Sequence, residues 1–157
     1  MELTWKYKID ISDPAVFDEI EKERQILFPD ELKEFILKTN ASTPSRYNFM
    51  LGNNERVFGA VLCFNENEPE VDSVFDALEV IEDKDLIPFG IDPFGNYICY
   101  SLKEKKIVFW NHETGRTEST EKSLEDFEFI VDKKIIPVKE FLTICEFDCK
   151  RFDFFCD

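Results

Sequence analysis

The sequence LIPFGIDPFGNYICYSLKEKKIVFWNHE, residues 86–113, carries the strongest strand pattern in the chain. Its two apolar runs, Tyr97–Leu102 and Ile107–Trp110, flank a short polar connection and are rich in β-branched and aromatic residues, which strands favour. A third apolar run, Leu86–Phe89, leads into the turn-forming residues Asp92–Asn96. The pattern predicts three short strands side by side, with the turns setting their register.

Residues before this stretch predict one strand and two helices. Apolar and polar residues alternate over residues 3–11, which is the period of a strand. A helix is expected from its N-cap, Asp13, to Phe28, because Pro29 disfavours helical geometry in the residue before it. A second helix is expected over residues 30–40. Its buried face should consist of Leu32, Phe35 and Ile36.

A hairpin and a short helix are predicted next. Two strands, residues 47–51 and 56–64, flank the turn residues Gly52–Asn54. Gly59, inside the second strand, is expected to mark a bulge or the close approach of another backbone segment. Apolar residues over Val71–Glu79 share one helical face, so a short amphipathic helix should precede the central strands.

The C-terminal part predicts one more helix and an unusual tail. Residues 123–134, with Ser123 as the cap, have a helical apolar face, and Pro137 would break the helix. Residues 137–157 are rich in Phe and Cys, and such a cluster must cover either the protein's own core or a partner. We find no repeat or linker, so we expect a single α+β domain over residues 1–157.

Composition limits the classes of function. The 157 residues include 17 Phe and are 43% hydrophobic, which is enough to form a core. The formal net charge of −15 argues against nucleic-acid binding, because contact with a phosphate backbone requires basic side chains. No apolar run approaches the length of a membrane span, and the first residues do not have the pattern of a signal peptide. We therefore expect a cytoplasmic protein that binds neither nucleic acid nor membrane.

The negative charge is concentrated in one segment. Residues 66–92 contain ten carboxylates and a single basic residue, Lys84. One interpretation is a solvated face that keeps the protein soluble. The other is a surface whose electric field steers a basic protein partner. On the second interpretation the candidate contact residues are Glu68, Glu70, Asp72 and Asp76.

The sequence predicts no cofactor, no metal site and no catalytic site. The cysteines are odd in number and form no CxxC pair, so we expect them to be reduced, with Cys63 and Cys99 acting as small buried hydrophobes. Phosphate-binding loops and the common hydrolase motifs do not occur. His112, the only histidine, follows a strand and could cap it, contact a partner or act as a base. Trp110 beside it could be a half-buried residue at the sheet edge or a ligand platform.

The order of these parts resembles the SUKH superfamily, which includes the fungal Smi/Knr-type cell-wall regulator and many bacterial immunity proteins. The likeness covers a core of about residues 12–131. It rests on the helix FPDELKEFILKTN with its Pro29, the run LIPFGIDPFGNYICYSL, the strand of KIVFWNHE, and Phe127 in SLEDFEFI. Family members often carry Asn-Gly after the second helix, where this chain has Asn40-Ala41. The Phe/Cys-rich extension over residues 137–157 has no match in the family pattern.

The resemblance implies an α+β fold, in which a twisted, mainly antiparallel sheet packs against helices from both ends of the chain. It implies no enzyme activity. Bacterial relatives are immunity proteins that bind and neutralise a toxin domain of polymorphic toxin systems, often a nuclease or a deaminase. A nuclease presents a basic cleft to its substrate, and an acidic surface would complement that cleft.

Three hypotheses of function follow. The first is a non-catalytic immunity protein that occludes a basic toxin domain by direct binding. Its expected contact residues are the four carboxylates Glu68, Glu70, Asp72 and Asp76, with Trp110 and His112 at the end of the sheet. The alternative is a regulatory scaffold that recruits cell-wall or signalling enzymes. The third is a small-molecule-binding or enzymatic domain that uses His112 and nearby carboxylates.

Overall fold

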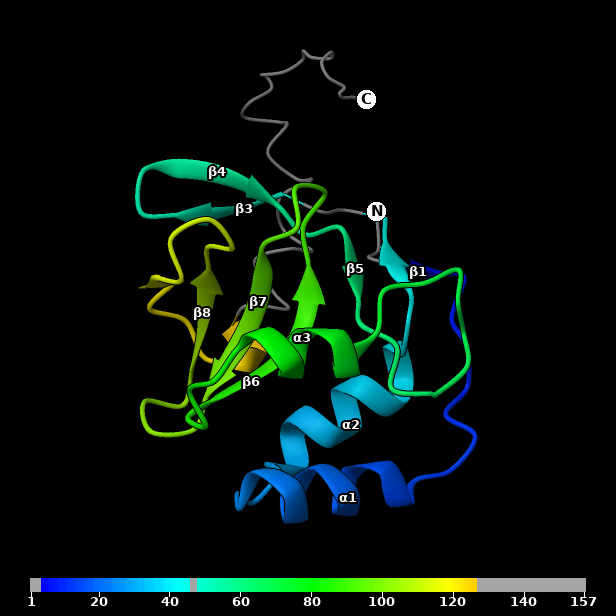
Figure 1. Ribbon diagram of the computed structural model, residues 1–157. Coiled ribbons are helices and arrows are strands. Elements are labelled where there is room, and N and C mark those ends of the chain that lie inside the picture. The colour runs from blue at the N-terminus through cyan, green and yellow to red at the C-terminus, as the bar shows by residue number, and fades with distance from the viewer. Residues whose placement is uncertain (1–3, 46–47, 127–157) are drawn as a thin grey trace.

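The computed structural model describes residues 4–45 and 48–126, and at its centre lies a five-stranded antiparallel sheet (Figure 1). In spatial order the strands are β5 (Ala60–Val61), β6 (Leu86–Ile91), β7 (Tyr97–Ser101), β8 (Lys106–Trp110) and β9 (Thr117–Ser119). Strands β6, β7 and β8 confirm the three predicted from residues 86–113. Strand β9 was not predicted, because its three residues are all polar.

The turn between β6 and β7 fixes the register of the sheet. The side chain of Asp92 is buried, and its Oδ1 accepts hydrogen bonds from the backbone N–H groups of Phe94 and Asn96, both at 2.9 Å. The register of β6 shifts between Pro88 and Gly90, where the proline has no N–H to donate to a neighbouring strand. The turn chemistry read from the sequence therefore sets the pairing of β6 with β7.

One face of the sheet carries most of the packing, and we call it the main-core face. Its sheet residues are Ile87, Phe89, Ile98, Tyr100, Ile107 and Phe109. They share one buried cluster with residues of α1 (Ala15–Arg24) and α2 (Asp30–Thr39). The ring of Phe35 meets that of Phe89 edge to face at 5.8 Å, and Leu32 and Ile36 are fully buried, so the predicted buried face of α2 is confirmed.

The opposite face, which we call the α3 face, is covered more thinly. Helix α3 (Val74–Val80) lies in front of β6 and β7 in Figure 1. Leu86, Cys99 and Val108 form a small buried cluster with Ile81, the residue that follows α3. The buried residues of α3 itself, Val74 and Ala77, belong to the main cluster. The partly buried rings of Tyr97 and Trp110 pack on the margin of the small cluster.

The strand predicted over residues 3–11 is wrong in its length. Strand β1 (Trp5–Lys6) pairs with β2 (Thr43–Pro44), and Tyr7 then takes a left-handed conformation with φ of 68°. The chain from residue 9 onward runs beside two asparagine side chains rather than beside a strand, so the alternating pattern continues past the strand itself.

Asn40 and Asn65 replace a neighbouring strand for this N-terminal segment. The Nδ2 of Asn40 donates to Ile9 O at 2.8 Å, while its Oδ1 accepts the N–H of Phe64 at 2.8 Å. The amide of Asn65 bonds the backbone at both ends of segment 10–12, at 2.8 and 3.0 Å. Both asparagines are buried, and their bonds satisfy backbone groups that would otherwise lack partners.

The first helix is also shorter than predicted. Helix α1 ends at Arg24 rather than Phe28, because Gln25 adopts a left-handed conformation with φ of 59° and closes the helix. The carboxylate of Glu21 then accepts the N–H of Phe28 at 2.7 Å. At the other end, Asp13 Oδ1 accepts the backbone N–H two residues further on, which supports its predicted capping role.

The predicted hairpin exists, but its second strand is divided. Strands β3 (Asn48–Leu51) and β4 (Asn54–Val57) pair with each other, whereas the prediction extended the second strand over residues 56–64. A Cβ at Gly59 would lie 2.8 Å from the carbonyl oxygen of Ile91, so the predicted close backbone approach is confirmed. This approach turns the chain away from β3 and sends β5 into the central sheet.

The predicted α+β fold with a mainly antiparallel sheet is thus confirmed. Cys63 and Cys99 are fully buried free thiols, as expected. Most of the last predicted helix, with Phe127, and the Phe/Cys-rich extension lie outside the described residues. Within the described part of the chain, no helix is long and apolar enough to span a membrane.

Candidate functional site

Two backbone hydrogen bonds join the end of the acidic loop between β5 and α3 to the buried residue Cys63 at its start. The N–H of Cys63 donates to Asp72 O at 2.8 Å, and its carbonyl oxygen accepts the N–H of Val74 at 3.0 Å. Ser73 lies between these two residues, and its Oγ accepts the N–H of Phe75 at 2.9 Å as the N-cap of α3. These hydrogen bonds therefore fix the backbone that carries the carboxylates of Asp72 and Asp76.

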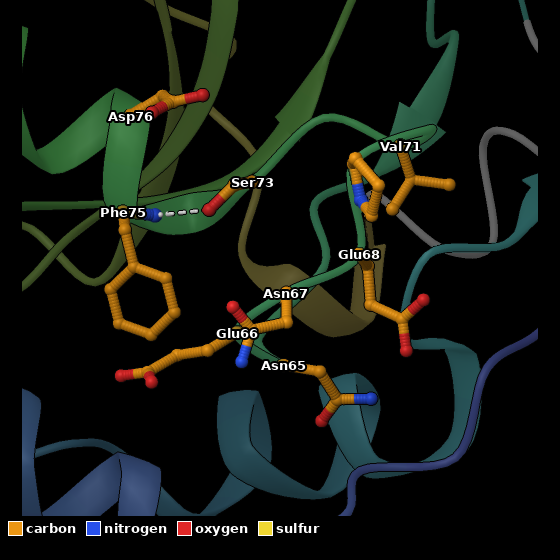
Figure 2. A pocket seen from close by; sticks show the side chains of 9 residues that line it. Asn65, Glu66, Asn67, Glu68, Val71, Ser73, Phe75 and Asp76 are labelled. Carbon is orange, nitrogen blue, oxygen red and sulfur yellow. Dashed lines mark hydrogen bonds between the residues drawn. The ribbon is translucent and has the colours of Figure 1, made fainter.

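An open hollow of about 580 Å³ lies between this loop and α3 (Figure 2). Figure 2 shows Phe75 and Asp76 pointing in opposite directions from the helix, while Glu66 and Glu68 extend from the loop. The hollow has both apolar and acidic walls, formed by Asn65, Glu66, Asn67, Glu68, Pro69, Val71, Ser73, Phe75 and Asp76.

Two aromatic rings lie side by side on the α3 face. Tyr97 is the first residue of β7 and Trp110 the last of β8, and the two are direct cross-strand partners. Their ring centroids are 5.8 Å apart with the planes inclined by 36°. Both rings are half-buried, whereas the next pair along the same strands, Cys99 and Val108, is buried. The aromatic pair therefore marks the point where the cover of the α3 face ends.

Negative charge from the acidic segment reaches this aromatic pair. Burial raises the pKa of the Tyr97 hydroxyl above its ordinary value of 10.0, and the nearby carboxylates of Asp72 and Asp76 raise it further. Both aspartates are exposed. The structure thus brings two carboxylates from the α3 region and two aromatic residues from the sheet into one neighbourhood.

His112 supports the turn at the same end of the strands. Its backbone N–H donates to Asn96 Oδ1 at 3.0 Å, and its ring Nδ1 lies 2.7 Å from the same oxygen. Because Asn96 Nδ2 donates to Asp92 Oδ2 at 3.0 Å, the Asn96 oxygen is the acceptor, so Nδ1 of His112 carries the proton. The ring also packs over Gly95, whose φ of 90° completes the turn.

Comparison with protein families identifies the chain. The SUKH family model described as SMI1-KNR4 cell-wall matches residues 16–127, which is well over half of the 157 residues. This chain belongs to the SUKH family. The predicted resemblance is therefore confirmed, and the match includes both the central sheet and the acidic segment. A search of curated proteins found no match to this SUKH domain.

The contact residues predicted from the sequence do not all lie in one place on the SUKH domain, and His112 lies at the β6–β7 turn. Glu68 and Asp76 line the hollow, and Asp72 and Asp76 act on Tyr97, so Asp76 belongs to both places. Glu70 is exposed in the acidic loop and does not line the hollow. Trp110 is half-buried, as one interpretation expected, but it is not at the sheet edge, because β9 lies beyond it. Their roles in binding a partner stay predictions.

Sequence reasoning missed Tyr97 as a residue of this surface, and it missed the exposure of Phe94. Tyr97 connects the carboxylates to Trp110, and the symmetric pairing of β7 and β8 about their polar connection could have identified it as the partner of Trp110. Phe94, at the tip of the β6–β7 turn, is 74% exposed, although it is flanked by residues that fix the turn. An apolar ring within a turn motif is the signal that could have identified it.

Among the described residues, no group of three or more His, Cys, Asp or Glu side chains is placed to hold a metal ion. His112 is not among the residues that line the hollow, and its Nδ1 is engaged with Asn96. The arrangement offers a surface of carboxylates and aromatic rings, which suits binding to another molecule more readily than acid–base chemistry.

Proposed function

We propose that this SUKH domain is a non-catalytic immunity protein, which acts in the cytoplasm by binding a basic toxin domain of nuclease or deaminase type and occluding its active site. The observation that carries the proposal is the SUKH family match in a chain with a formal charge of −15. A toxin that handles nucleic acid has a basic cleft, and a strongly acidic partner complements it.

The placement of the acids supports binding to a basic partner. Within residues 4–45 and 48–126 the ion pairs are Lys8–Asp10 and Lys106–Glu121, so the carboxylates of Asp72 and Asp76 have no basic partner there. Exposed, unpaired charges speed association, because their field steers an oppositely charged partner before contact.

Co-expression with a toxin domain encoded beside this protein tests the proposal. We expect the SUKH domain to protect the cell and to form a one-to-one complex. Replacing Glu68, Glu70, Asp72 and Asp76 by lysine should slow association by about tenfold or more at low salt. The association rate of this variant should depend little on added salt. Four lysines at Asp18, Glu19, Glu23 and Glu34, which are exposed on α1 and α2, provide the charge-matched control. Absence of both protection and complex would remove the proposal.

A regulatory scaffold that recruits cell-wall or signalling enzymes is the second candidate, and the cell-wall description of the matching family favours it. A scaffold would bind its enzymes without blocking their active sites. Activity of the bound enzyme therefore separates the two functions: an immunity protein abolishes it, and a scaffold leaves it intact.

A further inference from the structure

The Tyr97–Trp110 pair is the half-buried end of a sheet face whose other residues are buried. The strands hold both rings in a fixed cross-strand position, and their centroids lie 5.8 Å apart. One side of the pair rests on the buried cluster of Leu86, Cys99 and Val108, while the rest of each ring is open to solvent. A rigid, half-exposed aromatic pair loses little side-chain entropy on binding, which is typical of residues that dominate protein interfaces.

Negative charge stands beside these rings. Asp76 lies in the first turn of α3, the helix in front of β6 and β7 in Figure 1, and Asp72 lies just before that helix. Both side chains are exposed, and they form no ion pair within the described part of the chain. The hollow of Figure 2 continues the acidic surface from Asp76 to Glu68. A ligand that fits this surface needs a flat group for the rings and a positive charge for the carboxylates.

We propose that the Tyr97–Trp110 pair and the flanking Asp72 and Asp76 form a docking surface for an arginine side chain of a basic partner protein. The inference rests on the proposed function and names the part of the surface that recognises the toxin. A guanidinium group stacks on an aromatic face and binds carboxylates through paired N–H groups. Lysine carries the same charge but lacks the planar group and is more strongly hydrated, so it fits this surface less well.

Stacking of a guanidinium group on an aromatic ring already occurs within this protein, where the guanidinium carbon of Arg56 lies 5.2 Å from the ring centroid of Phe109. A second copy of the chain is a poor occupant. Two chains of charge −15 repel each other, and they would bring acidic residues against acidic residues at this surface. Charge complementarity therefore selects a basic partner.

Tryptophan fluorescence of the full chain provides a direct test. Trp5 and Trp110 are the two tryptophans, so a Trp5→Phe variant leaves Trp110 as the single reporter. The probes are a hexa-arginine peptide and a hexa-lysine peptide of equal length and charge. We expect the arginine peptide to change the Trp110 emission and to bind about tenfold more tightly than the lysine peptide, which is the range of a cation–π contact combined with a paired carboxylate.

Two variants and a matched control separate this surface from general attraction. The Asp72→Asn/Asp76→Asn double variant changes exposed residues, and it should lower the affinity for the arginine peptide about tenfold. Glu19→Gln/Glu23→Gln removes the same charge from the exposed side of α1 and should lower it less than twofold. Equal affinity for both peptides, or equal loss in both double variants, would overturn the inference.

The neighbouring toxin separates failure of this inference from failure of the proposed function. In the complex, Trp110→Leu should weaken toxin binding about tenfold or more, while circular dichroism confirms that the variant is folded. A toxin that is neutralised equally well by the Trp110→Leu and Asp72→Asn/Asp76→Asn variants overturns the docking surface and leaves the immunity function standing. Selective binding of the arginine peptide with no toxin binding supports the surface and removes the immunity function.

Discussion

The two faces of the central sheet are built from the same strands, but they are covered to different extents. The main-core face meets two helices and is lined by aromatic residues whose rings contact those of α2, as Phe35 and Phe89 do. The α3 face has only a small cluster around Cys99 and ends in the half-buried rings of Tyr97 and Trp110. The difference shows how one sheet can be rigid on one side and still offer fixed, accessible side chains on the other.

Matched truncations on the two faces include the variant with the largest expected effect, Ile98→Ala. Ile98 and Leu86 lose the same number of carbon atoms when replaced by alanine, and both are buried, one on each face. We expect Ile98→Ala to lower the free energy of unfolding by about 4 kcal/mol and Leu86→Ala by about 2 kcal/mol, because the thinner cover of the α3 face relaxes more easily around a cavity.

Urea unfolding at equilibrium measures both values. The m-value should stay unchanged in each variant, since only the stability and not the buried surface is altered appreciably. Equal losses in the two variants would contradict the difference between the faces.

The buried amide of Asn40 should have the next largest effect. Its side chain donates to Ile9 O and accepts the N–H of Phe64, both at 2.8 Å, and it also donates to Cys63 Sγ at 3.7 Å. Replacing Asn40 by alanine leaves the buried N–H of Phe64 and the partly buried carbonyl oxygen of Ile9 without these partners, and we expect a loss of about 3 kcal/mol. Asn54→Ala, at an exposed position of β4, is the control and should change stability by less than about 0.5 kcal/mol.

Hydrogen exchange adds a second measurement of the Asn40 variant. The N–H of Phe64 should exchange faster relative to the amides of β7, because its acceptor has been removed while the sheet is unaltered. Unchanged protection of Phe64 would contradict this role for Asn40.

Two tyrosines of β7 extend the comparison to alkaline pH. Tyr100, on the main-core face, donates its hydroxyl to Glu31 Oε2 at 2.8 Å, and burial together with this carboxylate raises its pKa to about 12 from 10.0. Because the pKa of Tyr100 is higher in the folded state, its contribution to the free energy of unfolding is complete below pH 10. That contribution is lost as the pH rises towards 12. Stability should therefore fall across this window, and Tyr100→Phe should make the fall less steep.

Tyr97→Phe should have a smaller effect on the same slope, because Tyr97 keeps part of its contact with water. Tyr7→Phe is the control, since Tyr7 is 81% exposed. Urea midpoints measured from pH 9 to pH 12 provide the data. An equal change of slope in all three variants would show that burial on the main-core face is not the cause.

The sequence predicted those parts of the fold whose cause is local. Strands β6, β7 and β8 follow from apolar runs and from the turn residues around Asp92, and the capping role of Asp13 follows from its position before Pro14. It failed where distant residues decide the structure. The segment after Tyr7 depends on asparagines 31 and 55 residues away, and no pattern within the segment itself shows that dependence.

The candidate surface was predicted only in part for the same reason. Composition identified the carboxylates of Asp72 and Asp76, because they belong to one dense acidic segment. Tyr97 was missed, since its position beside them arises from the way that α3 lies against β6 and β7. The pairing of Tyr97 with Trp110 also requires the exact number of residues in the β7–β8 turn.

The smallest expected effect is at Ala41, in the turn that follows α2. Ala41 is buried beside the end of α2 and has a φ of 64°, a conformation that costs a residue with a Cβ about 1 kcal/mol. Ala41→Gly removes this strain, but it also increases the entropy of the unfolded chain and removes a buried methyl group. These effects nearly cancel, so we expect the free energy of unfolding to change by less than about 1 kcal/mol.

Ala41→Val tests the same position by increasing the backbone strain, because a β-branched residue is strained at positive φ. A loss of stability in the valine variant that is no larger than the change in the glycine variant would show that the left-handed turn after α2 does not constrain this position.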